Sequence, residues 1–531
     1  MNLGSNPLHH FGIVAPGTAA GSISSGGIRD RWLDLSAILL LAVLAIHSLI
    51  VLGIGLSQPL LDLYNFRQTQ TALTAYWLWK CGPWLAYETP VLGYPWSIPF
   101  EFPTYQALVA LLRLIGIPID IGGRFVSFAF YLACLWPLSR LFRTLGFGRR
   151  SFLIVSILFL ASPLYLYWSR TVMIESCALF FGLLWLALLM SSLTDLRPAI
   201  LLWTAAAGIA TVLTKSTTFP AFLILGAILV LRQILRNGRT TISLRMLVLA
   251  LAAFAVPLVI GYLWFLYTEA IKAESPFGAL LTSARLAPWY FGTWQQRTGS
   301  AFWHGVVLNR ILPDIFGYGV PLAAVGAVAV FATSRFVWPA LAALVAFLVP
   351  LAVFTNLHFI HSYYQYANAI FALAIVGLGI AGIVERGYHR AAAAVLVVLV
   401  VLQLAFFWRT YGGYLTADYS TGNIVVISAI VRSRTPPDSG LIIFGSDWSS
   451  VIPYYSERKS LTVPEFTPRP LLQRVFDDPQ ALLADRPLAG IVYCRKTAKP
   501  NPALAPLIAS FLAQRKVLAQ AGDCQLLAGQ R

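Results

Sequence analysis

Charged residues are scarce in this chain. Only 11% of its 531 residues are charged, 58% are hydrophobic, and the mean hydropathy is +0.73. These values lie far outside the range of soluble globular proteins. The composition therefore excludes a soluble enzyme and predicts a polytopic integral membrane protein.

Cysteine and the common catalytic signatures are also lacking. The five cysteines form no CxxC pair, and the chain contains no HExxH, Walker loop, GxSxG or metal-ligand spacing. Zinc hydrolase, P-loop ATPase and α/β-hydrolase interpretations are thus unsupported. We expect no metal and no other cofactor, although this argument does not exclude a divalent metal.

The excess of positive charge has an arrangement typical of membrane topology. The formal net charge is +17, but the arginines lie between apolar runs and form no dense basic face. Basic loops of this kind mark the cytoplasmic side, so we expect no nucleic-acid partner. Residues 1–34 lack the basic start of a cleaved signal peptide and are predicted to be a flexible cytoplasmic N-terminus.

Residues 35–408 are predicted to form the membrane domain. A crossing needs roughly 20 apolar residues, and the sequence contains about 11 such runs. These runs are Leu35–Leu56, Ile121–Phe142, Phe152–Trp168, Ile174–Leu193, Ala199–Leu213, Ser216–Leu231, Met246–Tyr267, Ile311–Thr333, Phe336–Phe354, Ala367–Val384 and Ala391–Trp408. The run Thr104–Ile115 is too short and is interpreted as an interfacial helix, because this keeps every inner loop basic. An odd number of crossings places the C-terminus outside.

Residues 409–531 differ in composition from the membrane domain and are predicted to be a small soluble α/β domain outside the membrane. Strands are expected at Asn423–Val431, Leu441–Phe444 and Leu488–Tyr493, and helices at Pro470–Leu483 and Ala503–Gln514. Cys494 and Cys524 could pair on an oxidising side of the membrane, but their spacing does not decide this.

The outer loop 57–120 is the densest polar stretch and carries many aromatic residues, as segments at a membrane interface do. Few ionisable residues are predicted to lie outside the lipid and close to it. The carboxylates are Asp62, Glu88, Glu101, Glu175, Glu269, Glu274 and Asp314, and the cations include Arg67, Lys80, Arg124, Arg170, Lys215, Lys272, Arg285, Arg297 and Arg310. A general base and any phosphate ligands are expected among them.

Two residues and one cluster are notable, and each of the two residues has a structural alternative. Glu175 begins an apolar run, where an ionised side chain is functional or paired, for example with Arg170. Lys215 lies among hydroxyl groups that suit a phosphate, or it extends toward lipid head groups. His361, Tyr363 and Tyr364 form a polar aromatic cluster near a membrane edge.

The order of these features resembles the GT-C fold membrane glycosyltransferases, in the branch that contains protein O-mannosyltransferases and lipid A aminoarabinose transferases. The matching segments are Phe66–Ala72, Glu101–Tyr105, Gly123–Arg124, Ser162–Tyr167, Arg170–Glu175 and Thr214–Lys215. They cover roughly residues 35 to 220, and beyond that only the hydropathy and the His361–Tyr364 turn carry the likeness. The resemblance implies transfer of a sugar, with inversion, from a polyprenyl-phosphate donor at the outer leaflet.

The chain departs from the pattern of that family in its first outer loop. Many members have an acidic pair where this chain has Arg67 and Gln68, and a basic residue where it has Glu101. We therefore expect Glu101 to supply the catalytic carboxylate, with Asp62 as its rival. Substrate and phosphate contacts are expected from Arg67, Gln68, Arg170, Glu175, Lys215, His361, Tyr363 and Tyr364.

The partners implied by the resemblance are a polyprenyl-phosphate sugar, membrane lipids and a lipid, glycan or protein acceptor. The sequence does not show whether the sugar is a hexose or a pentose, and it does not identify the acceptor. A bacterial inner membrane with the active face in the periplasm is the expected location, and an endoplasmic-reticulum enzyme would obey the same orientation rule. The alternative function is a transporter or flippase for a lipid-linked sugar, but the polar residues gather at one face and not along the membrane midplane.

Overall fold

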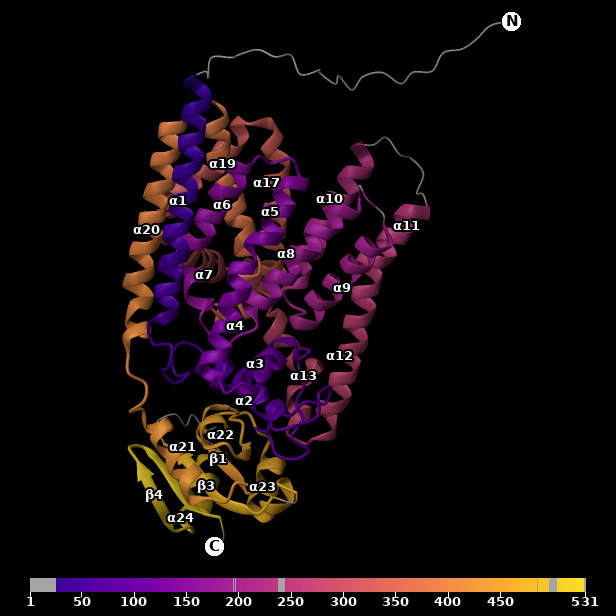
Figure 1. The fold of residues 1–531 in the computed structure, drawn as a ribbon. Helices are drawn as coiled ribbons and strands as arrows, with labels where there is room; N and C mark the ends of the chain where they lie inside the picture. Colours follow the sequence, from indigo (N-terminus) through magenta and orange to yellow (C-terminus); the bar gives the residue numbers. More distant parts are fainter. Residues whose placement is uncertain are drawn as a thin grey trace, which may run out of the picture.

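The computed structural model describes residues 25–193, 195, 197–236, 244–484, 486–495 and 504–529. Residues 1–24 of the predicted flexible N-terminus lie outside this part, and helix α1 (Ser25–Gly53) begins ten residues before the first predicted span. A long helical bundle carries a small sheet-containing domain at the end opposite the start of α1 (Figure 1). The chain is an integral membrane protein with a helical membrane domain and a small C-terminal α/β domain.

By length and composition, seven helical segments of the described residues can cross a membrane. They are Leu33–Gly53, Ile119–Thr144, Glu175–Ser192, Met246–Glu274, Ala301–Ala332, Ser334–Val353 and His389–Thr416, joined by the shorter apolar helices Pro198–Thr214, Phe219–Leu235 and Ala369–Glu385. Each predicted crossing coincides with one of these or with the pair α6 (Arg149–Ala161) and α7 (Pro163–Trp168). Helices satisfy their own backbone groups, which is why such runs fold this way in lipid.

The helices of the membrane domain have the following bounds: α4 Ile119–Ala133, α5 Leu135–Thr144, α8 Glu175–Ser192, α9 Pro198–Thr214, α10 Phe219–Arg236, α11 Leu244–Ala250, α12 Val256–Glu274, α13 Ser283–Phe291, α14 Trp294–Thr298, α15 Leu312–Phe316, α16 Val320–Ala329, α17 Ser334–Val353, α18 Thr355–Ile360, α19 Ala369–Glu385 and α20 His389–Thr416. Short π or 3-10 segments lie at Leu251–Ala255, Gly278–Leu281, Ala301–Ile311, Gly317–Gly319, Val330–Ala332 and Tyr364–Tyr366.

One break in the bundle follows directly from a proline. Pro163 disfavours the helical conformation at the preceding residue, and Ser162 accordingly adopts φ −63° and ψ 125° between α6 and α7. The Ser162 hydroxyl donates to the carbonyl of Ile315 at 2.9 Å, which ties the break to α15. The break lets the chain turn toward the loop that carries Arg170.

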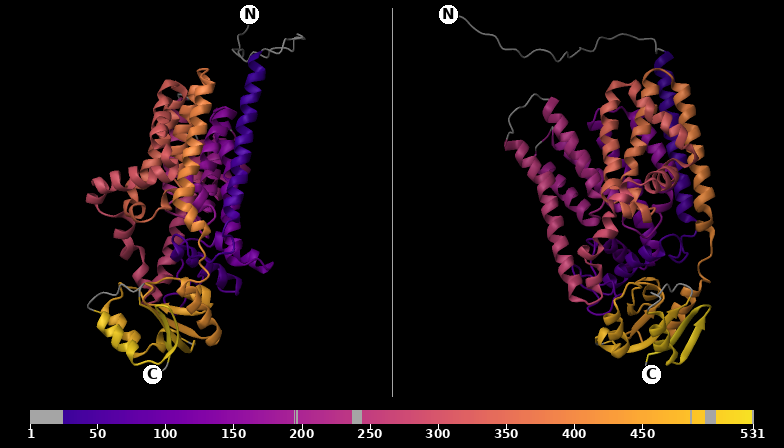
Figure 2. Two further views of the ribbon diagram at one scale, coloured as in Figure 1. Left: turned by 90° about the vertical axis from the view of Figure 1, so that its left-hand side faces the viewer. Right: turned by 180° about the vertical axis from the view of Figure 1, so that it is seen from behind.

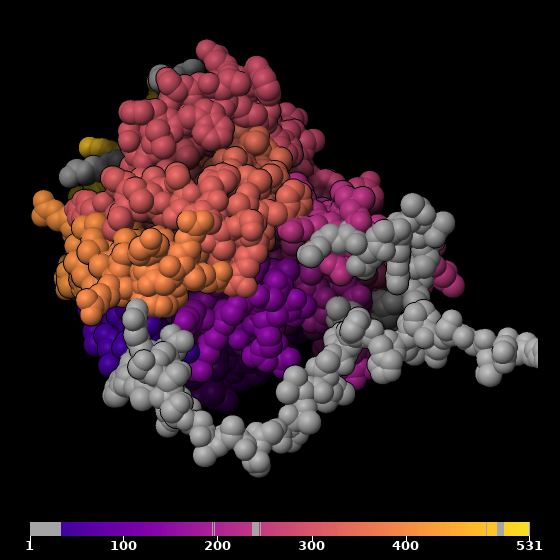
Figure 3. Space-filling model, turned by 90° about the horizontal axis from the view of Figure 1, so that it is seen from above, coloured from indigo at the N-terminus to yellow at the C-terminus, as the bar shows by residue number. Residues whose placement is uncertain are grey.

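Three helices diverge from the rest of the bundle at one end. Helices α10, α11 and α12 lean away from the others at the end where α1 begins, as two opposite views show (Figures 1 and 2). Viewed along the bundle from that end, α20 lies between α1 and the helices that precede α19 (Figure 3). Trp408 of α20 donates its indole N–H to His47 of α1 at 3.1 Å.

The outer loop 57–120 folds into two helices between the bundle and the C-terminal domain. Helix α2 (Asn65–Trp79) is almost wholly buried, and α3 (Thr104–Leu114) is the short helix expected at Thr104–Ile115. Side chains of α2 and α3 share a hydrophobic core with strands of the C-terminal domain, including Leu73, Tyr105, Ile442 and Leu461. The loop is thus a packed layer between the bundle and the C-terminal domain.

The C-terminal domain contains a five-stranded sheet of order β2-β1-β3-β5-β4, in which β2, β1 and β3 run parallel. Strands β1 and β3 confirm two expected strands, and the disulfide between Cys494 and Cys524 joins β3 to β5. The element bounds are α21 Asn423–Arg434, β1 Gly440–Phe444, α22 Val451–Ser456, β2 Lys459–Thr462, α23 Arg469–Asp477, a 3-10 turn Gln480–Leu482, β3 Leu488–Cys494, α24 Ala505–Ala513, β4 Val517–Ala521 and β5 Cys524–Ala528.

The prediction of a strand at Asn423–Val431 is wrong, because this segment is helix α21. Its many β-branched residues favour a strand. However, Ile427 and Val431 recur one helical turn apart and pack on Leu441 and Val492 of the sheet. The helical spacing of buried positions therefore outweighs the local strand propensity.

The outer loop adds an extended segment to the edge of this sheet. Next to β2, Ser460 N donates to Pro90 O at 3.1 Å, Thr462 N to Val91 O at 2.7 Å, and Gly93 N to Ser460 O at 3.0 Å. The ion pair of Lys459 with Glu88, at 2.6 Å, extends the contact. Strand β2, an edge strand of its own domain, is thereby covered by the loop.

Candidate active site

A cavity of about 790 Å³ opens where the outer loop, the membrane domain and the C-terminal domain meet. Its wall combines apolar residues with several charged side chains, as ligand sites do. Besides the charged groups described below, the wall includes Tyr64, Phe66, Gln70, Phe100, Val212, Leu213, Gly261, Trp264, Phe265, Leu280, Leu281, Leu286, Trp289, Tyr290, Phe466 and Pro468.

Arg67 and Glu101 form an ion pair on this wall. Arg67 lies in the first turn of α2, and Glu101 lies just before α3. Each side chain is 20% exposed, so both are accessible from the cavity. Arg67 also donates to Gln70 Oε1 at 2.6 Å, which orients the guanidinium. The Glu101 backbone is held by Tyr87, whose hydroxyl donates to the Glu101 carbonyl at 2.7 Å.

Tyr290 of α13 lines the same cavity. Burial, reinforced by the negative charge of Glu101, raises the pKa of Tyr290 to about 12. Its hydroxyl therefore stays protonated at neutral pH and can donate a hydrogen bond to an incoming oxygen. Sequence reasoning gave no signal for Tyr290, since nothing in its segment indicated that α13 returns to the loop.

Lys215 and Glu175 form a second ion pair, at 2.5 Å, beside the first. Lys215 lies in the turn between α9 and α10 and lines the cavity, whereas Glu175, the first residue of α8, lies behind it. The Lys215 ammonium also lies 4.1 Å from the centre of the Tyr364 ring, a cation–π contact. The suggested pairing of Glu175 with Arg170 is wrong, because Arg170 pairs with Asp62.

The aromatic cluster lines the same cavity. His361, Tyr363 and Tyr364 follow α18 and pack against one another, with ring centroids 4.9 to 5.5 Å apart; Tyr363 and Tyr364 are stacked. Burial and the nearby charge of Lys215 lower the pKa of His361 to about 4. His361 is therefore neutral at pH 7, and it offers a hydrogen bond to a ligand and not a positive charge.

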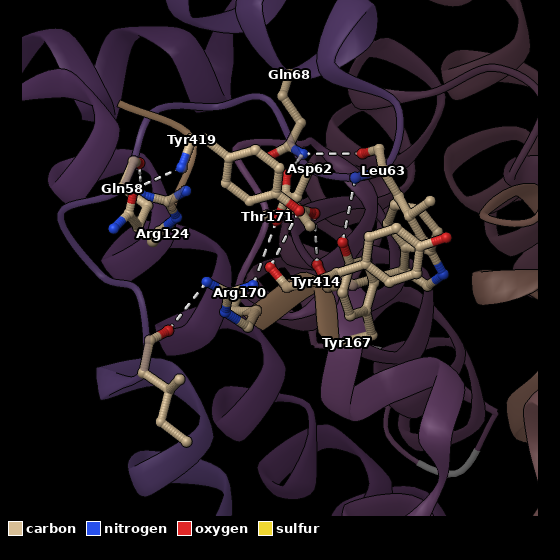
Figure 4. Close-up of polar contacts among 12 residues, drawn as sticks. Gln58, Asp62, Leu63, Gln68, Arg124, Tyr167, Arg170, Thr171, Tyr414 and Tyr419 are labelled. Carbon is tan, nitrogen blue, oxygen red and sulfur yellow. Dashed lines mark hydrogen bonds and ion pairs between the residues drawn. The ribbon is translucent and has the colours of Figure 1, made fainter. Parts of the chain in front are cut away.

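Asp62, Gln68 and Arg170 lie in a separate, buried network (Figure 4). Arg170 contacts Asp62 at 3.3 Å, with side-chain exposures of 2% and 3%, and donates to the carbonyl of Ile54 at 3.1 Å. Gln68 donates to Asp62 and accepts the amide N–H of Val172 at 3.1 Å. None of the three lines the cavity. They join the first outer loop to the turn before α8.

The structure adds charged residues that the sequence placed outside but did not select. Glu269 and Lys272 of α12 pair with each other, and Glu269 accepts the Ser283 amide at 2.7 Å. Arg285 of α13 lines the cavity and forms no ion pair with any described residue. Asp447 and Trp448 come from the C-terminal domain, for which the sequence indicated no role.

The cavity brings cations together with three lining carboxylates, Glu101, Glu269 and Asp447. Arg67, Lys215, Lys272 and Arg285 surround a volume that Glu101 and Tyr290 also reach. Arginine and lysine suit a phosphate ester, and a carboxylate can accept a proton. Within the described ranges, no group of three or more His, Cys, Asp or Glu side chains lies close enough together to hold a metal ion.

Comparisons with known proteins bear on the fold. No protein-family model matches the chain, and no curated protein matches it by sequence. Among solved structures, apo ArnT from Cupriavidus metallidurans superposes with a TM-score of 0.60 and 16% identity, covering 94% of this chain and 98% of that one. A second structure of that ArnT is bound to undecaprenyl phosphate; it gives a TM-score of 0.58 at 15% identity and covers 93% of this chain and 97% of that one.

Other enzymes share the arrangement over part of their length. The archaeal oligosaccharyltransferase AglB from Archaeoglobus fulgidus, in complex with an inhibitory peptide and a dolichol-phosphate, gives a TM-score of 0.58 at 13% identity and covers 88% of this chain and 70% of that one. The arabinofuranosyltransferase AftD from Mycobacteria gives 0.54 at 15% identity, covering 94% of this chain and 40% of that one. The chain therefore has the GT-C fold of membrane glycosyltransferases.

Proposed function

We propose that this protein is an integral membrane glycosyltransferase. It transfers a sugar from a polyprenyl-phosphate donor to a lipid, polysaccharide or protein acceptor on the outer, periplasmic face of a bacterial inner membrane. The observation that carries the proposal is the cavity between the loop 57–120, the membrane domain and the C-terminal domain, in which the accessible Glu101 lies among several cations. The GT-C fold supports the same function, since the ArnT and AglB structures contain polyprenyl phosphates.

Among the cations of the cavity, Arg285 is the one best placed to meet a donor phosphate. Arg67, Lys215 and Lys272 are each paired with a carboxylate, and Arg285 is the only lining cation without an acidic partner among the described residues. The lining carboxylate Asp447 comes from the C-terminal domain, whereas Arg285 comes from α13. A negatively charged donor phosphate would therefore bind on the Arg285 side of the cavity.

In the proposed reaction, Glu101 acts as the general base. It accepts the proton of an acceptor hydroxyl, and the hydroxyl oxygen attacks the anomeric carbon of the donor sugar. The bond from that carbon to the phosphate oxygen breaks, and the lipid phosphate leaves with the electron pair. A single displacement of this kind inverts the anomeric configuration.

The cations act on the leaving phosphate. Arg67 leaves Glu101 as the donor enters, and together with Arg285 and Lys215 it stabilises the growing negative charge. His361, as a neutral imidazole, and Tyr363 and Tyr364 bind the donor by hydrogen bonds and ring contacts. We propose that Asp62, Gln68, Arg170 and Glu175 act indirectly, by holding the loop and Lys215 in position.

These cations would perform the role that a divalent metal has in other phosphate-leaving reactions, so we propose that no metal cofactor is needed. Transfer by the purified enzyme should be unchanged within about twofold after treatment with excess EDTA. Activity that is lost with EDTA and restored by Mg²⁺ or Mn²⁺ would contradict this part of the proposal.

The function is tested by radiolabelled sugar transfer with a panel of polyprenyl-phosphate sugars and extracted membrane lipids, glycans and proteins as acceptors. Wild type and Glu101→Gln are compared, with Glu274→Gln as the matched control, because Glu274 is exposed and lies outside the cavity. Transfer that requires Glu101 and not Glu274 is the expected result. If folded wild type transfers no sugar from any donor but moves a lipid-linked sugar across vesicles, the protein is a flippase.

A further inference from the structure

The C-terminal domain contributes directly to the cavity. Asp447 and Trp448 follow the end of β1, and Phe466 follows the end of β2. Strands β1 and β2 are parallel neighbours, so their carboxyl ends lie at one edge of the sheet. In open α/β sheets, ligands bind at this edge. The edge faces the cavity that holds Glu101.

Trp448 is fixed against the two segments that carry the reactive pair. Its ring lies edge-to-face on Phe66, with centroids 4.6 Å apart, and 6.2 Å from Phe100. Phe66 precedes Arg67, and Phe100 precedes Glu101. A ligand that rests against Trp448 therefore lies next to the proposed general base.

Asp447 adds a carboxylate at the same place. It accepts the amide N–H of Glu465 at 3.0 Å, which ties the loop after β1 to the loop after β2. No basic side chain in the described part of the chain forms an ion pair with it. Its backbone has φ 48°, in the left-handed region that residues with a Cβ rarely adopt. A carboxylate held in this way is available to accept hydrogen bonds from a ligand.

We propose that Asp447, Trp448 and Phe466 form the acceptor subsite, and that the acceptor presents a sugar ring. The proposal rests on the function proposed above and names its acceptor class. Indole and phenyl groups cover the apolar face of a sugar ring, and a carboxylate accepts from neighbouring hydroxyl groups. The cations, by contrast, come from the loop and the membrane domain, where the donor phosphate would lie.

A peptide acceptor fits this site less well. Extended peptides commonly bind by adding a strand to a free sheet edge. Here the outer segment 90–93 already covers β2, through the hydrogen bonds of Ser460 and Thr462. The cavity therefore offers side chains and not the unpaired backbone groups of an outer strand. This favours a ligand that presents sugar rings and hydroxyl groups to those side chains.

The test uses the full-length protein in lipid nanodiscs and measures two binding events separately. The donor side is probed with undecaprenyl phosphate, and the acceptor side with fluorescent bacterial cell-envelope oligosaccharides and with Ser- and Thr-containing peptides. The variants are Asp447→Asn and Trp448→Ala. The controls are Asp438→Asn, a 94% exposed carboxylate of the same domain, and Trp84→Ala, a 56% exposed tryptophan outside the cavity.

We expect at least one oligosaccharide to bind and both variants to weaken it about tenfold, as loss of one charge-assisted hydrogen bond or one ring contact does. Undecaprenyl phosphate binding should change less than about twofold in all four variants. Absence of oligosaccharide binding, binding that both variants retain, or a peptide bound through Asp447 and Trp448 overturns the inference. Failure of wild type to bind undecaprenyl phosphate contradicts the proposed function instead, so the two failures are distinguishable.

Discussion

The first outer loop contributes a carboxylate to each of two arginine pairs, and their surroundings differ. Glu101 and Arg67 are each 20% exposed on the cavity wall, whereas Asp62 and Arg170 are at most 3% exposed and bonded to backbone and amide groups. The ionic chemistry is the same in both. The comparison teaches that access and the number of fixed partners separate a group that can react from one that holds the structure together.

The largest loss of activity is expected from a substitution of Glu101. Glu101→Gln removes the proposed base but keeps its size, so transfer should fall roughly 10²- to 10⁴-fold. The thermal unfolding midpoint should fall less than in Asp62→Asn, because the pair is less buried and Gln keeps a hydrogen-bond acceptor for Arg67. Sugar transfer and thermal unfolding measured on the same preparation check this. Wild-type transfer by the variant would show that Glu101 is not the base.

The opposite outcome is expected at Asp62. Asp62→Asn leaves Arg170 buried without a counter-charge, which costs roughly 3–5 kcal/mol of stability. Thermal unfolding in one detergent is compared with that of Asp195→Asn, which breaks an exposed pair with Arg197 and should cost less than about 1 kcal/mol. Asp62→Asn combined with Arg170→Gln should recover part of the loss. A stable but inactive Asp62→Asn variant would instead support Asp62 as the base.

The two members of the second ion pair differ in their access to the cavity. Lys215 lines the cavity and Glu175 does not. Lys215→Met should weaken binding of undecaprenyl phosphate about tenfold, the effect of one charged contact. Glu175→Gln keeps a hydrogen-bond acceptor that holds the Lys215 ammonium in position, so it should not weaken binding. Binding is measured by native mass spectrometry with Lys80→Met, an exposed lysine outside the cavity, as control. Equal losses in both variants would assign the pair to structure alone.

The smallest effect is expected from pH at His361. Because burial and Lys215 lower its pKa to about 4, His361 is neutral from pH 5.5 upward and carries no proton to lose there. The profiles of transfer against pH for wild type and His361→Gln should therefore have the same shape between about pH 5.5 and 8. An inflection near pH 6.5 that disappears in the variant would show a charged His361 in the working enzyme.

Much of the membrane domain was predictable because hydropathy is a local signal. Each apolar run became a helix or helix pair, and the shortness of the run Thr104–Ile115 correctly predicted α3. Helix α21 was missed since its β-branched residues favour a strand until the sheet provides a surface for Ile427 and Val431. Strands β2, β4 and β5 were not predicted, because short strands depend on partners that are distant in sequence.

The site was predictable only in part. Residue type and position selected Glu101, Arg67, Lys215 and the His361 cluster, and the structure brings them to one cavity. The same criteria selected Asp62 and Arg170, since charge and loop position do not reveal which carboxylate meets which cation. Asp447 and Trp448 could not be found, because their approach depends on how the C-terminal domain docks.

The extended segment beside β2 has a consequence for how the protein is made. Pro90 and Val91 are synthesised some 370 residues before Ser460 and Thr462, which donate to their carbonyls. Until then the outer loop lacks its partner strand, and a C-terminal domain released alone would expose the β2 edge to other chains. The cavity is therefore completed only after β2 has been synthesised, and chains truncated before β2 should be prone to degradation.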